Sequence, residues 1–247
     1  MKKHNLIALM VVLLLLLCGC KQEEAAAEGS MKLEELFART AASVEEGHFF
    51  FAGKVASAMA EKKMISFYDV ETEKSTFYKV EVTEDPFNCL PDRTLTVCIM
   101  GNTENFPDRN VLEKGKEYLF DTTLWVQEEE VVMLLPTFYE VLPECREEAL
   151  FYTDQSTTVV INGTRADYWA QLKKMTEEKG YAPQTVLSGI QGRLQQAIER
   201  NADYFEELKF EALDRAALSR TVTTAEALLE QAKNTEPTWG GIEELLK

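Results

Sequence analysis

Alternation of apolar and polar side chains in the middle of the chain limits the fold more than any other feature of the sequence. In residues 75–84, STFYKVEVTE, one face carries Tyr78, Val80 and Val82, and the other carries Lys79, Glu81 and Thr83. Residues 93–100, RTLTVCIM, alternate in the same way. A period of two is typical of an antiparallel strand with one buried face. This part of the chain is therefore expected to form a sheet.

Further strands are expected on both sides of this pair. They are HFFFAGKVASAM (48–59), EKGKEYLFDTTLWV (113–126), VVMLLP (131–136) and STTVVING (156–163). The second and third are expected to pair around a solvated turn at residues 127–130. Five or six short strands at this spacing favour a small barrel or sandwich.

Helical patterns lie before and after the strands. Residues 31–46 place Leu33, Leu36 and Phe37, with Thr40 and Val44, at helical spacing. After Gly163, helices are expected at 166–180, from Pro183 through a stripe of Leu187, Ile190, Leu194, Ile198, Phe205 and Leu208, and at 224–233 and 241–247. Packing of the stripe on the barrel and binding of a partner helix both remain open. The expected fold is α+β: an antiparallel β-domain over residues 31–163 and a helical C-terminal region over 164–247.

The first residues have the composition of a secretory signal. A positive start at Met1–Asn5 precedes twelve apolar residues, Leu6–Leu17. As a helix these span about 18 Å, too short for a hydrocarbon core of roughly 30 Å. A short apolar segment between a positive flank and small residues is typical of a cleaved signal peptide. The sequence therefore predicts an exported protein.

The end of this segment, Leu17-Cys18-Gly19-Cys20, resembles the lipobox of bacterial lipoproteins. The resemblance implies cleavage between Gly19 and Cys20, removal of residues 1–19, and attachment of palmitate-type acyl chains at Cys20. Residues 20–30 would form a flexible tether. The protein would then sit on the extracytoplasmic face of the cell membrane. An ordinary signal peptide cut elsewhere is the alternative.

Four segments of the β-domain, FFFAGKV, FYKVEVTE, TLTVCIMG and LEKGKEYLF, resemble the OB-type barrels of the netrin-module and metalloproteinase-inhibitor-like superfamily. The resemblance covers roughly residues 33–140 and implies an OB-like barrel. Inhibitors of that superfamily place the amine of an N-terminal Cys-x-Cys on a protease zinc. Lipobox processing would remove Cys18 and alkylate Cys20, so this mechanism is not expected here.

Charge narrows the classes of partner. The net charge is −16, of which residues 20–163 contribute −15 and residues 164–247 contribute −3, while Lys2 and Lys3 contribute +2. Such a surface repels phosphate backbones, so nucleic-acid binding is disfavoured. Either the acidity serves solubility, or the first half meets a basic partner.

Residues with catalytic or ligating chemistry are few. Once the signal is removed, His48 is the remaining histidine, and no nucleophile elbow or phosphate-binding loop occurs. We expect His48 to be a packing or surface residue, and no catalytic, cofactor or metal site is assigned. A disulfide between Cys89 and Cys98, a pairing with Cys145, and three thiols without a bridge remain alternatives.

The sequence therefore favours a lipid-anchored, non-catalytic module that binds an envelope or extracellular protein or glycan. One alternative is a protease inhibitor that acts through the loop Gly101–Asn110. Another is a carboxylate-dependent envelope hydrolase, which would need two acids facing each other across a cleft. The aromatic residues are expected mainly in the core, with an aromatic platform that binds a sugar or a peptide as the alternative; they are Trp125, Trp169 and Trp239, with Phe49, Phe50 and Phe51.

Overall fold

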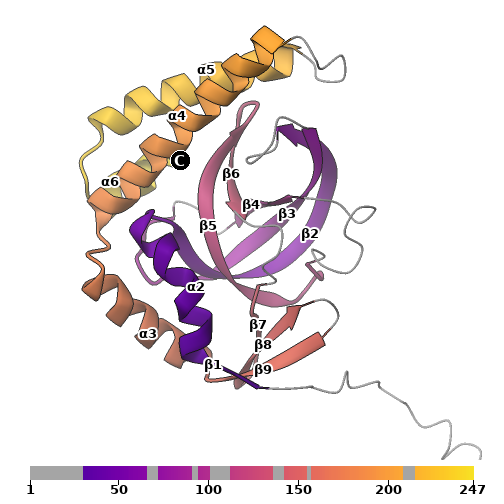
Figure 1. The fold of residues 1–247 in the computed structure, drawn as a ribbon, viewed down its shortest axis with the longest axis vertical. Helices are drawn as coiled ribbons and strands as arrows, with labels where there is room; N and C mark the ends of the chain where they lie inside the picture. Colours follow the sequence, from indigo (N-terminus) through magenta and orange to yellow (C-terminus); the bar gives the residue numbers. More distant parts are fainter. Residues whose placement is uncertain are drawn as a thin grey trace, which may run out of the picture.

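The structure, a computed structural model, describes residues 30–65, 72–90, 94–100, 112–135, 142–154, 157–207 and 215–247. The strands are β1 (Ser30–Lys32), β2 (Phe49–Ile65), β3 (Thr72–Glu84), β4 (Thr94–Met100), β5 (Glu117–Gln127), β6 (Glu130–Leu135), β7 (Glu144–Arg146), β8 (Ala149–Asp154) and β9 (Thr157–Asn162). The helices are α2 (Leu33–Glu45), α3 (Arg165–Glu178), α4 (Pro183–Glu207), α5 (Arg215–Asn234) and α6 (Trp239–Leu245). Strands thus fill the first part of the chain, and α3 to α6 follow β9 (Figure 1).

Five of the strands close into a barrel. Antiparallel pairs join β2 to β3, β3 to β4, β5 to β6 and β5 to β2, and a parallel pair of β4 with β6 completes the ring. Strand β5 can close the ring because residues 117–122 pair with β2 and residues 123–127 pair with β6. The expected α+β fold with an OB-like barrel is therefore confirmed, with one parallel pairing among the antiparallel ones.

A smaller piece of sheet extends from β5 outside the barrel. Strand β7 pairs with the start of β5, β8 lies between β7 and β9, and β1 runs parallel to β9. The sequence pattern does not predict β1, β7 or β8. It also extends the first helix over Met31 and Lys32, which lie in β1, because a three-residue strand is too short to show a period of two.

The alternation in the centre of the chain has the expected cause. Tyr78 and Val80 of β3 are buried, whereas Glu81 and Thr83 are exposed. Strand β2 differs because both of its faces are covered. Phe49 and Phe51 lie in the barrel core, and Phe50 lies in a second core formed with α2 and α3. Burial on both faces accounts for the uninterrupted FFFA run.

Local signals set the ends of the helices. Helix α2 buries the full predicted stripe of Leu33, Leu36, Phe37, Thr40 and Val44. The chain then turns at Gly47, whose φ of +73° suits glycine. Helix α3 begins with a capping box, in which the Thr164 side chain and the Asp167 carboxylate each accept the other residue's backbone N–H.

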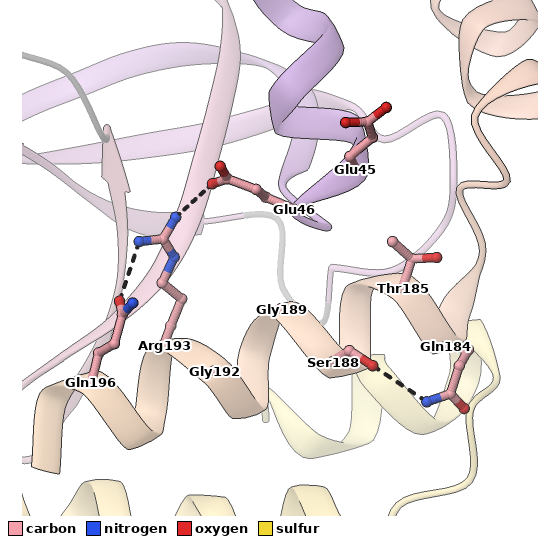
Figure 2. A pocket seen from close by; sticks show the side chains of 9 residues that line it. All are labelled: Glu45, Glu46, Gln184, Thr185, Ser188, Gly189, Gly192, Arg193 and Gln196. Atoms are coloured by element: carbon pink, nitrogen blue, oxygen red, sulfur yellow. Dashed lines mark hydrogen bonds and ion pairs between the residues drawn. The ribbon is translucent and has the colours of Figure 1, made fainter. Parts of the chain in front are cut away.

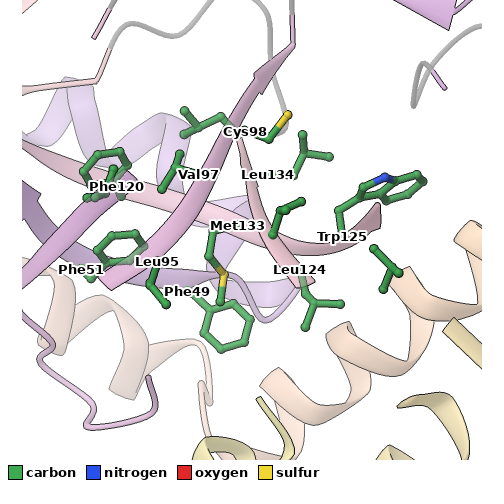
Figure 3. Close-up of a cluster of buried hydrophobic side chains, with 14 of the residues drawn as sticks. Phe49, Phe51, Leu95, Val97, Cys98, Phe120, Leu124, Trp125, Met133 and Leu134 are labelled. Atoms are coloured by element: carbon green, nitrogen blue, oxygen red, sulfur yellow. The ribbon is translucent and has the colours of Figure 1, made fainter. Parts of the chain in front are cut away.

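The C-terminal helices pack on the barrel and share its core. The stripe residues Leu187, Ile190 and Leu194 of α4 are at most 3% exposed and contact the barrel core, together with Leu229 of α5 and Ile242 of α6. Figure 3 shows the barrel side of this core, with Phe49 and Leu124 directed toward the helices. The part of the apolar stripe from Leu187 to Ile198 is thus a packing face of this chain, whereas the side chains of Phe205 and Leu208 lie outside the described ones. None of the helices in the described ranges is both long and apolar enough to span a bilayer.

Candidate functional site

An open groove of about 700 Å³ lies between the end of α2 and the first half of α4. We call it the α2–α4 groove. Its lining residues are Glu45, Glu46, Gln184, Thr185, Ser188, Gly189, Gly192, Arg193 and Gln196 (Figure 2). Every lining residue is polar or a glycine, so the groove is suited to a hydrogen-bonding ligand.

Two glycines bring the walls of the groove together. A Cβ atom on Gly47 would lie 2.4 Å from the Thr185 carbonyl oxygen, and one on Gly189 would lie 2.4 Å from the Glu46 carbonyl oxygen. Real Cβ atoms do not approach so closely, so the turn after α2 and helix α4 are in backbone contact at this point. The contact fixes the position of α4 relative to the barrel.

Charged side chains bridge the groove. Arg193 Nη2 lies 2.9 Å from Glu46 Oε2, and Arg193 Nη1 donates to Gln196 Oε1 at 3.4 Å. The Arg193 side chain is only 14% exposed, whereas that of Glu46 is 56% exposed. On the same wall, Glu45 forms an ion pair with Lys179. The arginine is thus held against the fold, and the two carboxylates project into solvent.

Behind this wall lies His48, which is only 3% exposed. Its Nδ1 donates to Asp121 Oδ1 at 2.7 Å, and its Nε2 lies 3.3 Å from Glu46 Oε2. Its carbonyl oxygen accepts a hydrogen bond of 2.6 Å from the Tyr181 hydroxyl. His48 is therefore a packing residue, and it links β5 to the groove wall through two carboxylates.

The groove does not have the geometry of a two-acid hydrolase. Glu45 and Glu46 are neighbours on one wall, and the lining residues of α4 opposite them include no acid. The Ser188 hydroxyl accepts a hydrogen bond of 3.4 Å from Gln184 Nε2. Within the described residues, the His48 ring contacts carboxylates, with no serine or cysteine among its partners.

The cysteines Cys89, Cys98 and Cys145 are all thiols in the structure, without a bridge among them. The strand register explains why Cys89 and Cys98 do not pair. Cys98 lies opposite Phe77, whereas the Cys89 thiol lies 3.9 Å from Asp85, eight residues further along the chain. Eight residues of strand span roughly 25 Å, and a disulfide requires Cα atoms within about 7 Å.

Burial raises the pKa of the Cys89 and Cys98 thiols far above the ordinary value. For Cys145, burial and then the negative charge of Glu117 raise the pKa to about 12. All three thiols are therefore protonated near neutral pH, which makes them poor nucleophiles.

The large aromatic side chains are mostly structural. Trp125, Trp169 and the three phenylalanines of β2 are buried. Trp239 is half-buried and packs against Phe87 and Tyr181, with ring centroids 5.5 and 5.7 Å apart. None of these rings lines the α2–α4 groove.

Several predicted sites lie outside the described residues. These are the cleavage site at Gly19 and Cys20, the lipidation site Cys20, most of the tether, and the loop Gly101–Asn110. In the ranges that the structure describes, no group of three or more His, Cys, Asp or Glu side chains could hold a metal ion.

No pattern in the sequence predicts the groove directly. The one signal for it is the pair Gly189 and Gly192 inside a predicted long helix, where glycine is unfavourable. No protein-family model and no curated protein sequence matches the chain.

Proposed function

We propose that this chain is a lipid-anchored surface protein that acts as a non-catalytic binding module through the α2–α4 groove. The observation that carries the proposal is the groove itself, an open recess lined by polar residues and glycines beside the contacts of Arg193 with Glu46 and of His48 with Asp121. Its walls are fixed by backbone contact, so the site is formed before a ligand arrives.

The loop after β5 and the interior of the barrel are occupied by other parts of the chain, which supports the groove as the binding site. OB-type barrels commonly bind ligands with the loop between their last two strands. Here that loop is held by α5: the Glu128 N–H donates to Thr221 Oγ1 at 2.8 Å, and the Glu128 carboxylate lies 2.7 Å from Arg220 Nη2. The barrel interior is filled by its own side chains and those of α4. A ligand therefore meets the groove more readily than the barrel end.

The anchor rests on the lipobox-like residues Leu17–Cys20 and on the position of β1. The described fold begins at Ser30, ten residues after Cys20, at the edge of the smaller sheet (Figure 1). An extended linker of ten residues reaches about 33 Å, enough to hold the module clear of the lipid headgroups. Intact mass and membrane fractionation of wild type and Cys20→Ala test this part. An unmodified wild-type protein in the soluble fraction would refute the anchor.

Site-specific photocrosslinking in producing cells tests the binding function. A photoreactive benzoylphenylalanine is placed at Gln196 on the edge of the groove and, as a matched control, at Gln231 of α5. Both are exposed helical glutamines, of which Gln196 lines the groove and Gln231 does not. We expect a discrete adduct from position 196 that is absent from position 231. Identical adduct patterns at both positions, or none from 196, would contradict binding at the groove.

A further inference from the structure

Nothing in the described part of the chain requires glycine at position 192, in the floor of the groove. It lies in the interior of α4, where glycine is less favourable than alanine. Its neighbour Gly189 is required by the contact with Glu46, but a Cβ on Gly192 would meet nothing within 4 Å. Its φ also lies outside the left-handed region that would demand glycine. Because position 192 has no side chain, a ligand in the groove can approach the backbone of α4 closely.

The side chains around Gly192 carry both donors and acceptors. Gln184, Ser188 and Gln196 are exposed on the same stretch of α4. Amide and hydroxyl groups match the alternating N–H and C=O groups of an extended polypeptide. A sugar would also hydrogen-bond to them, but the groove has no aromatic ring against which a sugar face could stack. The lining therefore favours a peptide over a glycan.

Charge specifies the peptide further. Glu45 and Glu46 project from the wall opposite Gly192, with side chains 58% and 56% exposed. Lys179, which pairs with Glu45, is itself exposed to solvent and can be displaced by an incoming cation. Glu46 keeps its contact with Arg193, the one cation among the lining residues, so the two carboxylates still leave the lining with a net negative charge. The net charge of −16 attracts positive ligands over a longer range.

We propose that the α2–α4 groove binds an extended, basic polypeptide segment. The segment lies with its backbone against Gly192 and directs a lysine or arginine side chain to Glu45 and Glu46. This inference rests on the proposed function and names its ligand class. Binding of an intact basic protein would then occur through an exposed basic strand or tail, the kind of partner that an acidic surface module meets outside the cell.

Fluorescence anisotropy with the full chain in mild detergent tests the inference. The probe is a fluorescein-labelled peptide of three Gly-Ser-Lys repeats, and a peptide with glutamate in place of lysine is its control. Titrations at about 0.15 M salt limit the screening length to about 8 Å, which suppresses general attraction to an acidic protein.

The protein variants separate the groove from overall charge. Glu45→Gln with Glu46→Gln removes two charges at the groove, and Glu34→Gln with Glu35→Gln removes two from the first turn of the same helix. Gly192→Trp fills the groove, with Gly240→Trp as its control. Glu45→Gln alone retains the Glu46 contacts, so it reports on binding even where the double variant folds poorly.

We expect the lysine peptide to bind the wild type, and the groove variants to weaken binding by about tenfold or more, with the controls within twofold. Equal losses in the two glutamine pairs would show general electrostatic attraction and overturn the site. Absence of binding by the lysine peptide would overturn the basic-peptide class. In that case a crosslink at position 196 would still leave the groove as a binding site, so the two proposals fail separately.

Discussion

Replacing Gly189 by alanine should separate the turn after α2 from helix α4. The added Cβ would lie 2.4 Å from the Glu46 carbonyl oxygen and 3.3 Å from that of Gly47. Both are backbone atoms, so no side-chain rotation can relieve the overlap. Overpacking costs about 1 to 3 kcal/mol, and this contact belongs at the upper end. Higher helix propensity returns about 1 kcal/mol. We therefore expect a net loss of about 1 to 2 kcal/mol in the free energy of unfolding.

Gly192→Ala is the matched control, in the same helix and three residues away. Nothing lies within 4 Å of its Cβ position, so the propensity gain is unopposed and stability should rise by up to about 1 kcal/mol. Urea unfolding of the full chain, followed by tryptophan fluorescence and circular dichroism, gives both values. Changes of the same sign in the two variants would refute the backbone contact between α4 and the turn after α2.

Three further predictions concern the turns and one of the thiols. Glu128→Gly should be about 1 kcal/mol more stable than Glu128→Ala, because both variants lose the Arg220 ion pair but only glycine tolerates the φ of +55° at this position. Equal midpoints of urea unfolding for the two variants would disprove strain at this turn. Asp85→Ala should lower the free energy of unfolding by about 3 kcal/mol and Asp85→Asn by about half of that, because the Asp85 carboxylate accepts hydrogen bonds from three backbone N–H groups. A loss below about 0.5 kcal/mol for the alanine variant would count against this role. The rate of alkylation of Cys145, whose pKa is raised to about 12, should increase about tenfold per pH unit from pH 8 to 11 when it is followed by mass spectrometry. Glu117→Gln should raise the rate at pH 8, because it removes a negative charge that raises this pKa. A plateau of the rate near pH 9 would contradict the raised pKa.

Sequence reasoning succeeded where one physical pattern acted over many residues. The alternation around Tyr78 and Val80 predicts β3, because these two side chains enter the barrel core whereas Glu81 and Thr83 are exposed. The stripe from Leu187 to Leu194 predicts α4 for the same reason, at a helical period. Long amphipathic elements average out local exceptions, so their type can be recognised from the residues alone.

Short strands and the groove depend on contacts between distant residues. Strand β7 has three residues and exists because β5 and β8 lie on either side of it. The groove forms where Glu46, at the end of one helix, meets Gly189 and Arg193, more than 140 residues later. No local pattern encodes such a meeting. The sequence left a Cys89–Cys98 disulfide open for the same reason, since closeness in sequence does not show whether two residues meet in the fold, and in the structure both are thiols.

The core shared by the barrel and the C-terminal helices has a consequence for the timing of folding. The last barrel strand ends at Leu135, but Ile242 is fully buried in the same core. About one hundred residues must therefore be synthesised between the two, which takes roughly 5 to 20 seconds at typical elongation rates. During that interval the strands exist without their full apolar cover. A chaperone that binds extended apolar segments has several seconds to reach Phe49 and Leu124, whose side chains point toward the helices (Figure 3), before the helical cover is complete.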